Sequence, residues 1–157
     1  MVADLKYSTL DYIDEDLKLQ INNFRNNTAG IGGKIRTEEE LFIHNDKYCS
    51  DGDIKKWILV FDKKSLVGMG AIFERQIIYL GKSIKLGGVG KVRVAEKYRR
   101  KGIASQIMKI IMNQLKEIKV DVAFLCTNNE SFLGDFYRKY GFQLLCRPYK
   151  FKGKSGK

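Results

Sequence analysis

The sequence predicts an α/β (α+β) fold in which a mixed, mostly antiparallel central sheet carries helices on both faces. Short apolar runs of strand length alternate along the chain with segments whose apolar residues recur at helical spacing. In the middle of the chain, apolar runs follow one another with only tight turns between them, which favours antiparallel pairing. These observations give the expected order βααβββαβαβ.

The N-terminal third is expected to supply one strand and two helices. The strand covers residues 5–13, and a helix follows over residues 15–26. Glycines within residues 28–33 interrupt regular structure. Thr37 and Glu40 then form a capping box, which starts a short helix through about residue 47.

The middle of the chain is expected to form three strands. Residues 57–61 are an apolar run typical of a buried strand, and residues 62–65 make a hairpin turn. Two long strands follow over residues 66–79 and 84–94, joined near Gly81.

The last third is expected to contain a helix, a strand, a helix and a strand in that order. The first helix covers residues 102–118, and a buried strand follows over residues 122–126. The second helix ends at Gly141, and residues 142–149 form the closing strand. The apolar faces consist of Ile103, Ile107, Ile110, Ile111, Leu115 and Ile118 in the first helix, and of Phe132, Phe136 and Tyr140 in the second.

Length and composition indicate one globular domain over residues 1–150, followed by a basic tail, residues 151–157, that is expected to be disordered. Hydrophobic residues make up 44% of the chain and charged residues 30%, as in ordinary globular proteins. No apolar run is long enough to span a membrane, and the N-terminus lacks the apolar core of a secretory signal. We therefore expect a cytoplasmic protein with no membrane partner.

Cysteine and histidine usage argues against metal and nucleophile chemistry. Cys49, Cys126 and Cys146 are too widely spaced for a metal site or a disulfide framework, so no metal cofactor is expected. Cys126 lies in an apolar run, which predicts a buried, inert thiol. His44 is the only histidine, and its neighbours do not support a Ser-His-Asp or Cys-His mechanism.

The net charge of +11 is unevenly distributed along the chain. Residues 1–60 carry 11 acidic and 8 basic residues, a net −3, whereas residues 61–157 carry 7 and 21, a net +14. A basic half of this kind attracts nucleic acid, acidic lipid or an acidic ligand, although many such lysines are ordinary solvated surface. Most aromatic residues lie at core-like positions, which disfavours a nucleic-acid-binding module.

The most informative pattern is Arg99-x-x-Gly102-x-Ala104, which follows a predicted strand and opens a predicted helix. The unpaired amides and the dipole at a helix N-terminus favour a phosphate there. Gly102 and Ala104 lack the bulk that would block an anion, and Arg99, Arg100 and Lys101 add formal charge. The spacing matches neither G-x-x-x-x-G-K-S/T nor G-x-G-x-x-G, so it does not indicate a P-loop or a Rossmann site.

This motif, the order of elements and the stretch Phe-Tyr-Arg-Lys-Tyr-Gly-Phe at residues 136–142 together resemble the GNAT family of acetyl-CoA-dependent N-acetyltransferases. The resemblance covers essentially the whole chain and is strongest over residues 86–142. It implies a GNAT fold, acetyl-CoA as cosubstrate and direct attack of an amine on the acetyl carbonyl. A weaker resemblance, over residues 86–92 and 125–127, is to the branch that contains aminoglycoside 2'-N-acetyltransferases.

The resemblance implies a role for each matching residue. Tyr137 would protonate the departing thiolate of coenzyme A. The backbone of Val92, Arg93 and Val94 would pair with the pantetheine arm like an added strand. The pyrophosphate would be held by the backbone amides of Arg99, Arg100, Lys101, Gly102, Ile103 and Ala104.

Two further family roles leave alternatives. Asn129 or its neighbour Asn128 would contact coenzyme A, although the spacing to Tyr137 is longer than in the usual pattern. For the general base, Glu74 is the candidate, with a salt-bridged surface glutamate as the alternative interpretation. Glu96 lies in a turn that is expected to face solvent, and a water chain would also serve as the base.

The acceptor is expected to be a primary amine of a small molecule or a peptide. Acids in the N-terminal third, including Asp14, Glu15 and Asp16, could line its groove, although acids also favour helix N-termini. The alternative function is a non-catalytic sensor that binds acyl-CoA. A homodimer is compatible with the sequence.

Overall fold

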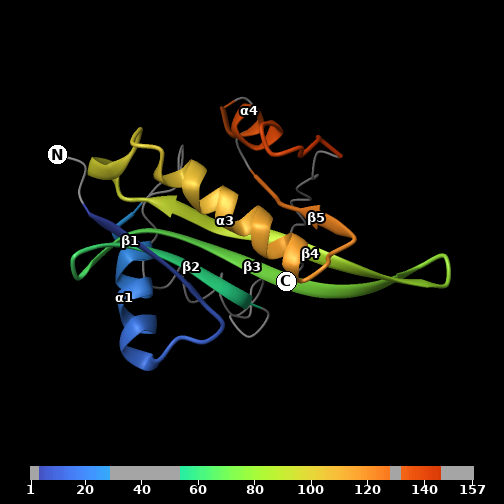
Figure 1. Cartoon of the computed structure of the whole chain (residues 1–157), viewed down its shortest axis with the longest axis horizontal. Coiled ribbons are helices and arrows are strands. Elements are labelled where there is room, and N and C mark those ends of the chain that lie inside the picture. Colours follow the sequence, from blue (N-terminus) through green and yellow to red (C-terminus); the bar gives the residue numbers. More distant parts are fainter. Residues whose placement is uncertain (1–3, 29–53, 128–131, 146–157) are drawn as a thin grey trace, which may run out of the picture. The chain divides into compact units, whose positions relative to one another are not determined.

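A five-stranded sheet lies at the centre of the first of the two units into which the chain divides, residues 1–126 and residues 127–157. The computed structural model describes residues 4–28, 54–127 and 132–145 of the 157. The strands lie in the order β1-β2-β3-β4-β5, and all neighbours pair antiparallel except β4 and β5, which are parallel (Figure 1). The predicted mixed, mostly antiparallel sheet is confirmed.

The described elements follow the expected order as far as the last helix. They are β1 (Leu5–Leu10), α1 (Glu15–Asn26), β2 (Ile54–Asp62), β3 (Ser65–Tyr79), β4 (Lys82–Val94), the 3-10 turn η2 (Glu96–Tyr98), α3 (Ile103–Glu117), β5 (Val122–Phe124) and α4 (Phe132–Arg138). Among the described residues, no helix combines the length and the apolar character needed to cross a membrane.

Helices α1 and α3 cover opposite faces of the sheet (Figure 1). The side chain of Asp14 caps α1, because its Oδ1 accepts a hydrogen bond from the backbone N–H of Leu17 at 2.8 Å. Ile21 and Phe24 of α1 belong to a buried cluster with residues of β2 and β3. Because both faces are covered, residues 57–60 of β2 are all buried, as the apolar run predicted.

Glycines in β3 and β4 let α3 approach the sheet closely. A Cβ atom on Gly70 of β3 would lie 2.8 Å from Cγ2 of Ile107, and one on Gly87 of β4 would lie 2.5 Å from Cδ2 of Leu115. Any larger residue would push the helix away from the strands. The helix therefore lies at a fixed height over the sheet, and its N-terminus is positioned beside the end of β4.

Two strands are shorter than the sequence predicts. β1 ends at Leu10, where its pairing with β2 stops at Trp57, and the next residue, Asp11, forms an ion pair with Lys56 at 2.7 Å. β5 covers only Val122–Phe124, because its pairing with β4 is limited to Leu86–Gly88.

Cys126 and the residues after Gly141 also differ from prediction. Cys126 is exposed rather than buried, because it follows the end of β5 and no longer lies in the sheet. Gly141 adopts a φ of +88° after α4, but residues 142–145 form no strand, and Leu145 is 95% exposed. The apolar runs at these two places predicted buried residues, but Cys126 and Leu145 are exposed. The predicted helix at residues 37–47, Cys49, His44 and Cys146 lie outside the described residues.

Candidate functional site

The N-terminus of α3 is an open turn. Gly102 is the N-cap residue and adopts a left-handed conformation, with φ of +78°. A Cβ atom on Gly102 would meet no atom of a described residue within 4 Å, so the described part of the chain leaves the space over the turn open. Because glycine has no side chain to cap the helix, the amide of Ala104, the second helical residue, receives no acceptor from the N-cap residue. The turn therefore has no side-chain cap, and binding of an anion there stays a prediction.

Three cationic side chains surround this turn, and they behave differently. Arg100 and Lys101 are exposed, and Arg100 also has a positive φ of 60°. Arg99 is half-buried, and its Nε donates a hydrogen bond to the carbonyl of Val94 at 3.1 Å. Arg99 thus ties the turn to the end of β4, a role that the motif did not indicate.

Tyr98 fixes the turn from the other side. Its hydroxyl donates a hydrogen bond to a carboxylate oxygen of Asp62 at the end of β2, and this bond raises the pKa of Tyr98. The ammonium groups of Lys97 and Lys101 each lie 5.2 Å from the centre of the Tyr98 ring. These cation–π contacts hold positive charge beside the open turn. Sequence reasoning missed this cluster, because Asp62 lies 36 residues before Tyr98.

A β-bulge distorts β4 shortly before the turn. The pairing with β3 is irregular there, so that Lys91 and Val92 together lie opposite Gly70. Lys91 adopts a positive φ of 54° at this point. Bulges increase the local twist of a strand, redirect its side chains and are common beside active sites.

The end of β4 separates from β5 beyond the bulge. β5 pairs with β4 only at Leu86–Gly88, so within the described part of the chain no strand flanks residues 92–94 on that side. The side chain of Arg93 points to the end of α1, where its Nη1 donates to the carbonyls of Arg25 at 3.1 Å and Thr28 at 2.7 Å. The side chain of Arg93 is therefore directed away from the predicted contact with the pantetheine arm, for which only its backbone remains.

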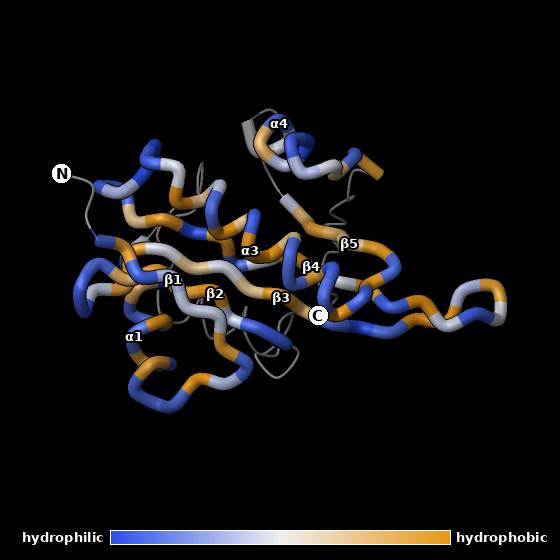
Figure 2. Tube along the Cα trace, viewed as in Figure 1, coloured by the Kyte–Doolittle hydropathy of each residue, from blue (hydrophilic) through white to orange (hydrophobic). Residues whose placement is uncertain are grey.

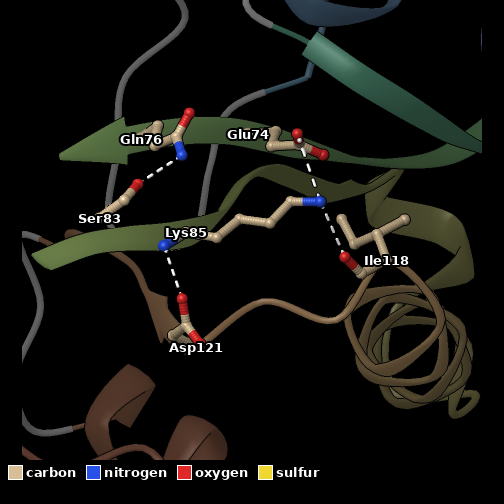
Figure 3. A network of polar contacts seen from close by, with 6 residues as sticks. All are labelled: Glu74, Gln76, Ser83, Lys85, Ile118 and Asp121. Atoms are coloured by element: carbon tan, nitrogen blue, oxygen red, sulfur yellow. Dashed lines mark hydrogen bonds and ion pairs between the residues drawn. The ribbon is translucent and has the colours of Figure 1, made fainter.

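Glu74 lies near the opposite end of α3 from the open turn, in the polar network of Figure 3. The Nζ atom of Lys85 lies 3.5 Å from Oε1 of Glu74 and donates to the carbonyl of Ile118 at 2.8 Å. The second oxygen, Oε2 of Glu74, is buried and accepts no hydrogen bond from a described residue. Glu74 is therefore ion-paired, and one of its carboxylate oxygens has no hydrogen-bond partner among the described residues.

Lys85 also joins β4 to the connection between α3 and β5. The backbone N–H of Lys85 donates to Oδ2 of Asp121 at 2.7 Å (Figure 3). In return, the backbone N–H of Asp121 donates to the carbonyl of Lys85 at 2.9 Å. Beside this network lies a shallow cavity of about 370 Å³, lined by Glu74, Arg75, Gln76 and Lys85.

Tyr137 lies in α4, in the second unit of the chain. Its ring makes edge-on contacts with Phe136 and Phe142, at centroid distances of 5.2 and 6.1 Å. Burial raises the pKa of the Tyr137 hydroxyl above the ordinary value of 10.0. The hydroxyl therefore stays protonated at neutral pH and can donate a proton.

The remaining sequence predictions concern Asn129, Glu96 and metals. Asn129 and Asn128 lie outside the described residues. Glu96 is exposed in η2, as expected. No group of three or more potential metal ligands occurs among the described residues.

The chain matches the same family that the open turn and the order of its elements suggest. A family model described as an acetyltransferase (GNAT) domain matches residues 5–145. Among curated proteins, none matches the chain significantly.

Solved structures similar to the chain have the same fold over nearly its whole length. A putative acetyl transferase from Pyrococcus furiosus has a TM-score of 0.68 at 17% identity, over 93% of this chain and 99% of that one. A predicted acetyltransferase with acetyl-CoA from Clostridium acetobutylicum has a TM-score of 0.65 at 18% identity, over 94% and 96%. An aminoglycoside acetyltransferase from an uncultured soil metagenomic sample has a TM-score of 0.62 at 18% identity, over 94% and 97%. At these identities the likeness shows the fold alone.

Proposed function

The chain belongs to the GNAT family of acetyltransferases, and we propose that it transfers the acetyl group of acetyl-CoA to a primary amine of a small molecule or a peptide. The observation that carries this proposal is the open turn at the N-terminus of α3. Gly102 leaves the first amides of the helix without a capping side chain, and Arg100 and Lys101 are exposed beside them. A pyrophosphate supplies both the acceptors for these amides and the negative charge that the cations favour.

The pantetheine arm would lie along the end of β4. Beyond Gly88 no described strand pairs with β4 on the β5 side, and the bulge at Lys91 turns the backbone of Val92, Arg93 and Val94. An extended arm with amide groups can pair with such a backbone as an added strand would. Asn129 is proposed as a further contact to coenzyme A.

The reaction requires one bond to form and one to break. The neutral amine nitrogen attacks the acetyl carbonyl carbon, and the bond between that carbon and the sulfur of coenzyme A breaks. The sulfur departs as a thiolate, which takes a proton from the hydroxyl of Tyr137, and Tyr137 regains its proton from solvent. Because burial raises the pKa of Tyr137, its hydroxyl holds the proton at neutral pH and has it available to donate.

The nitrogen must also lose a proton, and Glu74 is the proposed acceptor among the described residues. Its Oε2 is buried and accepts no described hydrogen bond, so it has a lone pair available for a proton delivered through water. Its Oε1 already faces Lys85. That ion pair favours the alternative in which the chain binds acyl-CoA as a sensor and has no base for turnover.

For the acceptor, we propose a small or peptide amine that carries little other positive charge. A polycationic acceptor would be repelled by a protein of net charge +11 unless acids lined its site. Asp14 already caps α1, and Glu15 forms a contact with Lys18 at 3.5 Å, so these acids have local partners.

The test follows release of free coenzyme A thiol from acetyl-CoA across a panel of primary amines. Turnover of an uncharged or monocationic amine supports the proposal. Tight binding of acetyl-CoA without thiol release for any amine would instead support the sensor. Absence of acetyl-CoA binding at about millimolar concentration, the weak end of specific affinities, would contradict both.

A further inference from the structure

The hairpin of β3 and β4 extends beyond the rest of the sheet. β2 pairs with β3 as far as Phe73, and β5 pairs with β4 only from Leu86, so residues 75–85 form a two-stranded arm without a third described strand (Figure 1). A two-stranded ribbon has little stability of its own in water. Its length therefore calls for a functional explanation.

The tip of this arm is apolar and exposed. Ile78 is 73% exposed, Tyr79 is 60% exposed and Leu80 is 84% exposed, and apolar residues continue to the end of the arm in Figure 2. Single exposed apolar residues are common, but a contiguous group of this kind marks an interaction site.

The apolar residues occupy both faces of the ribbon. Tyr79 pairs with Lys82, and Ile77 pairs with Ile84, on one face, whereas Ile78 pairs with Ser83 on the other. Residues directly opposite each other in an antiparallel pair share a face. A flat protein partner covers one face, whereas an apolar medium into which the tip inserts covers both.

The turn at the tip is occupied by a residue that the backbone disfavours. Leu80 and Gly81 have positive φ angles of 49° and 74°, as in a two-residue hairpin turn whose usual residues are Asn, Asp and Gly. A branched apolar residue in this conformation is strained. At an exposed position, packing within the protein does not compensate for such strain. A strained residue there is expected where its side chain binds something outside the protein.

The charges of the arm select the surface into which it inserts. Lys82 lies beside the tip and Arg75 lies at the base of the arm, whereas the ammonium group of Lys85 is paired with Glu74. The sequence contains no Asp or Glu from residue 75 to residue 95. The whole protein carries a net charge of +11, which opposes association with a second copy of itself. An anionic lipid surface is attracted by such cations, and its interface accommodates Leu, Ile and Tyr together with flanking Lys and Arg.

We propose that the tip of the β3–β4 arm, Ile77 to Leu80, inserts into the interface of an anionic membrane and holds the protein on that surface. This docking is peripheral and needs no membrane-spanning segment. It is separate from the proposed acetyl transfer, so vesicle binding and turnover of a soluble amine can fail independently of each other.

The test measures binding of the full chain to vesicles of phosphatidylcholine with and without phosphatidylserine. The decisive variant is Leu80→Asn, because Asn suits a positive φ and removes the apolar side chain without disturbing the fold. Wild type should bind the vesicles that contain phosphatidylserine, and Leu80→Asn should bind them at least about tenfold more weakly, the loss of one buried leucine. Leu19→Gln, at a 61% exposed leucine of α1, is the matched control and should bind as wild type does.

Three results would overturn the proposal. Wild type could fail to bind anionic vesicles at low salt. Leu80→Asn could bind them as tightly as wild type, which would mean that surface charge alone drives adsorption. Sedimentation could reveal a dimer in wild type that Leu80→Asn dissociates, in which case the tip is a contact between copies. A thermal midpoint for Leu80→Asn that is equal to or above that of wild type confirms in each case that the variant is folded.

Discussion

Single residues determine the chemistry proposed for this chain, and each does so through a different physical property. Gly102 contributes a backbone conformation and the absence of a side chain. Arg100 and Lys101 contribute exposed charge, whereas Nε of Arg99 donates a hydrogen bond to the carbonyl of Val94. A substitution at each position should therefore change a different measurable quantity.

Replacing Tyr137 by Phe should lower kcat by about 100-fold or more, the usual contribution of a general acid. The affinity for acetyl-CoA should stay nearly unchanged, because the ring is kept. Since burial raises the pKa of Tyr137 above 10.0, wild-type kcat should not decline from its ionisation until the pH exceeds that value. Steady-state kinetics across pH test both points, and equal kcat values for the two proteins would remove Tyr137 from the mechanism.

Replacing Glu74 by Gln tests the proposed base. Gln keeps the shape of the side chain and can still accept from Lys85, but it cannot take up the proton. If Glu74 is the base, kcat should fall about 100-fold at neutral pH, with thermal unfolding little changed. The control is Lys85→Met, which breaks the ion pair and leaves the carboxylate in place. Unchanged kcat in folded Glu74→Gln would assign the base role to water.

Some features of single residues could be predicted from the sequence, and others could not. The open turn was predictable, because Gly102 and its basic neighbours are contiguous in the chain. The contacts of Tyr98 with Asp62 and of Arg93 with Arg25 and Thr28 were not, because they join segments that only the fold brings together.

At the scale of elements, the position of α3 over the sheet governs where the open turn lies. Gly70 and Gly87 fix the height of the helix, and Lys85 binds its C-terminal carbonyl at Ile118. The sequence predicted β2, β3, β4 and α3 well, because their apolar patterns are long and regular. β5 and Cys126 were predicted less well, since a short apolar run does not reveal how many partner residues the neighbouring strand offers.

Replacing Gly70 by Ala should destabilise the protein by about 1–3 kcal/mol, because the new methyl group would overlap Cγ2 of Ile107. The methyl groups of a β-branched side chain cannot move aside easily. Gly134→Ala is the matched control: its new Cβ would lie 3.4 Å from the flexible Arg138 side chain, so stability should stay the same or rise. Denaturant unfolding measures both, and equal stability of Gly70→Ala and wild type would refute the packing argument.

At the scale of the whole molecule, charge is the dominant property. The chain has a net −3 over residues 1–60 and +14 over residues 61–157. The basic part contains both the open turn and the arm, so it attracts anions to the proposed acetyl-CoA site and to the proposed membrane surface. The sequence predicted this asymmetry and the fold class. Which amine is accepted depends on the shape of a groove that no motif in the sequence describes.

The affinity for acetyl-CoA should depend on ionic strength. Raising the salt from about 0.01 M to about 1 M shortens the Debye length from about 30 Å to about 3 Å. The dissociation constant should then rise severalfold, because exposed cations such as Arg100 and Lys101 are screened. Titrations at several salt concentrations measure this, and a dissociation constant independent of salt would show that these cations do not contact the phosphates.

The central claim is that the Gly102 turn binds acetyl-CoA, and calorimetric titration of wild type, Gly102→Val and Gly81→Val tests it most directly. Gly81 is a matched control, because its φ of +74° is close to the +78° of Gly102 and a new Cβ at either position would meet no described atom within 4 Å. Both variants should lose similar stability, about 1–3 kcal/mol from backbone strain. We predict that Gly102→Val binds acetyl-CoA at least about tenfold more weakly, while Gly81→Val binds like wild type. Equal affinity in wild type and folded Gly102→Val, or no binding by wild type, would contradict the account.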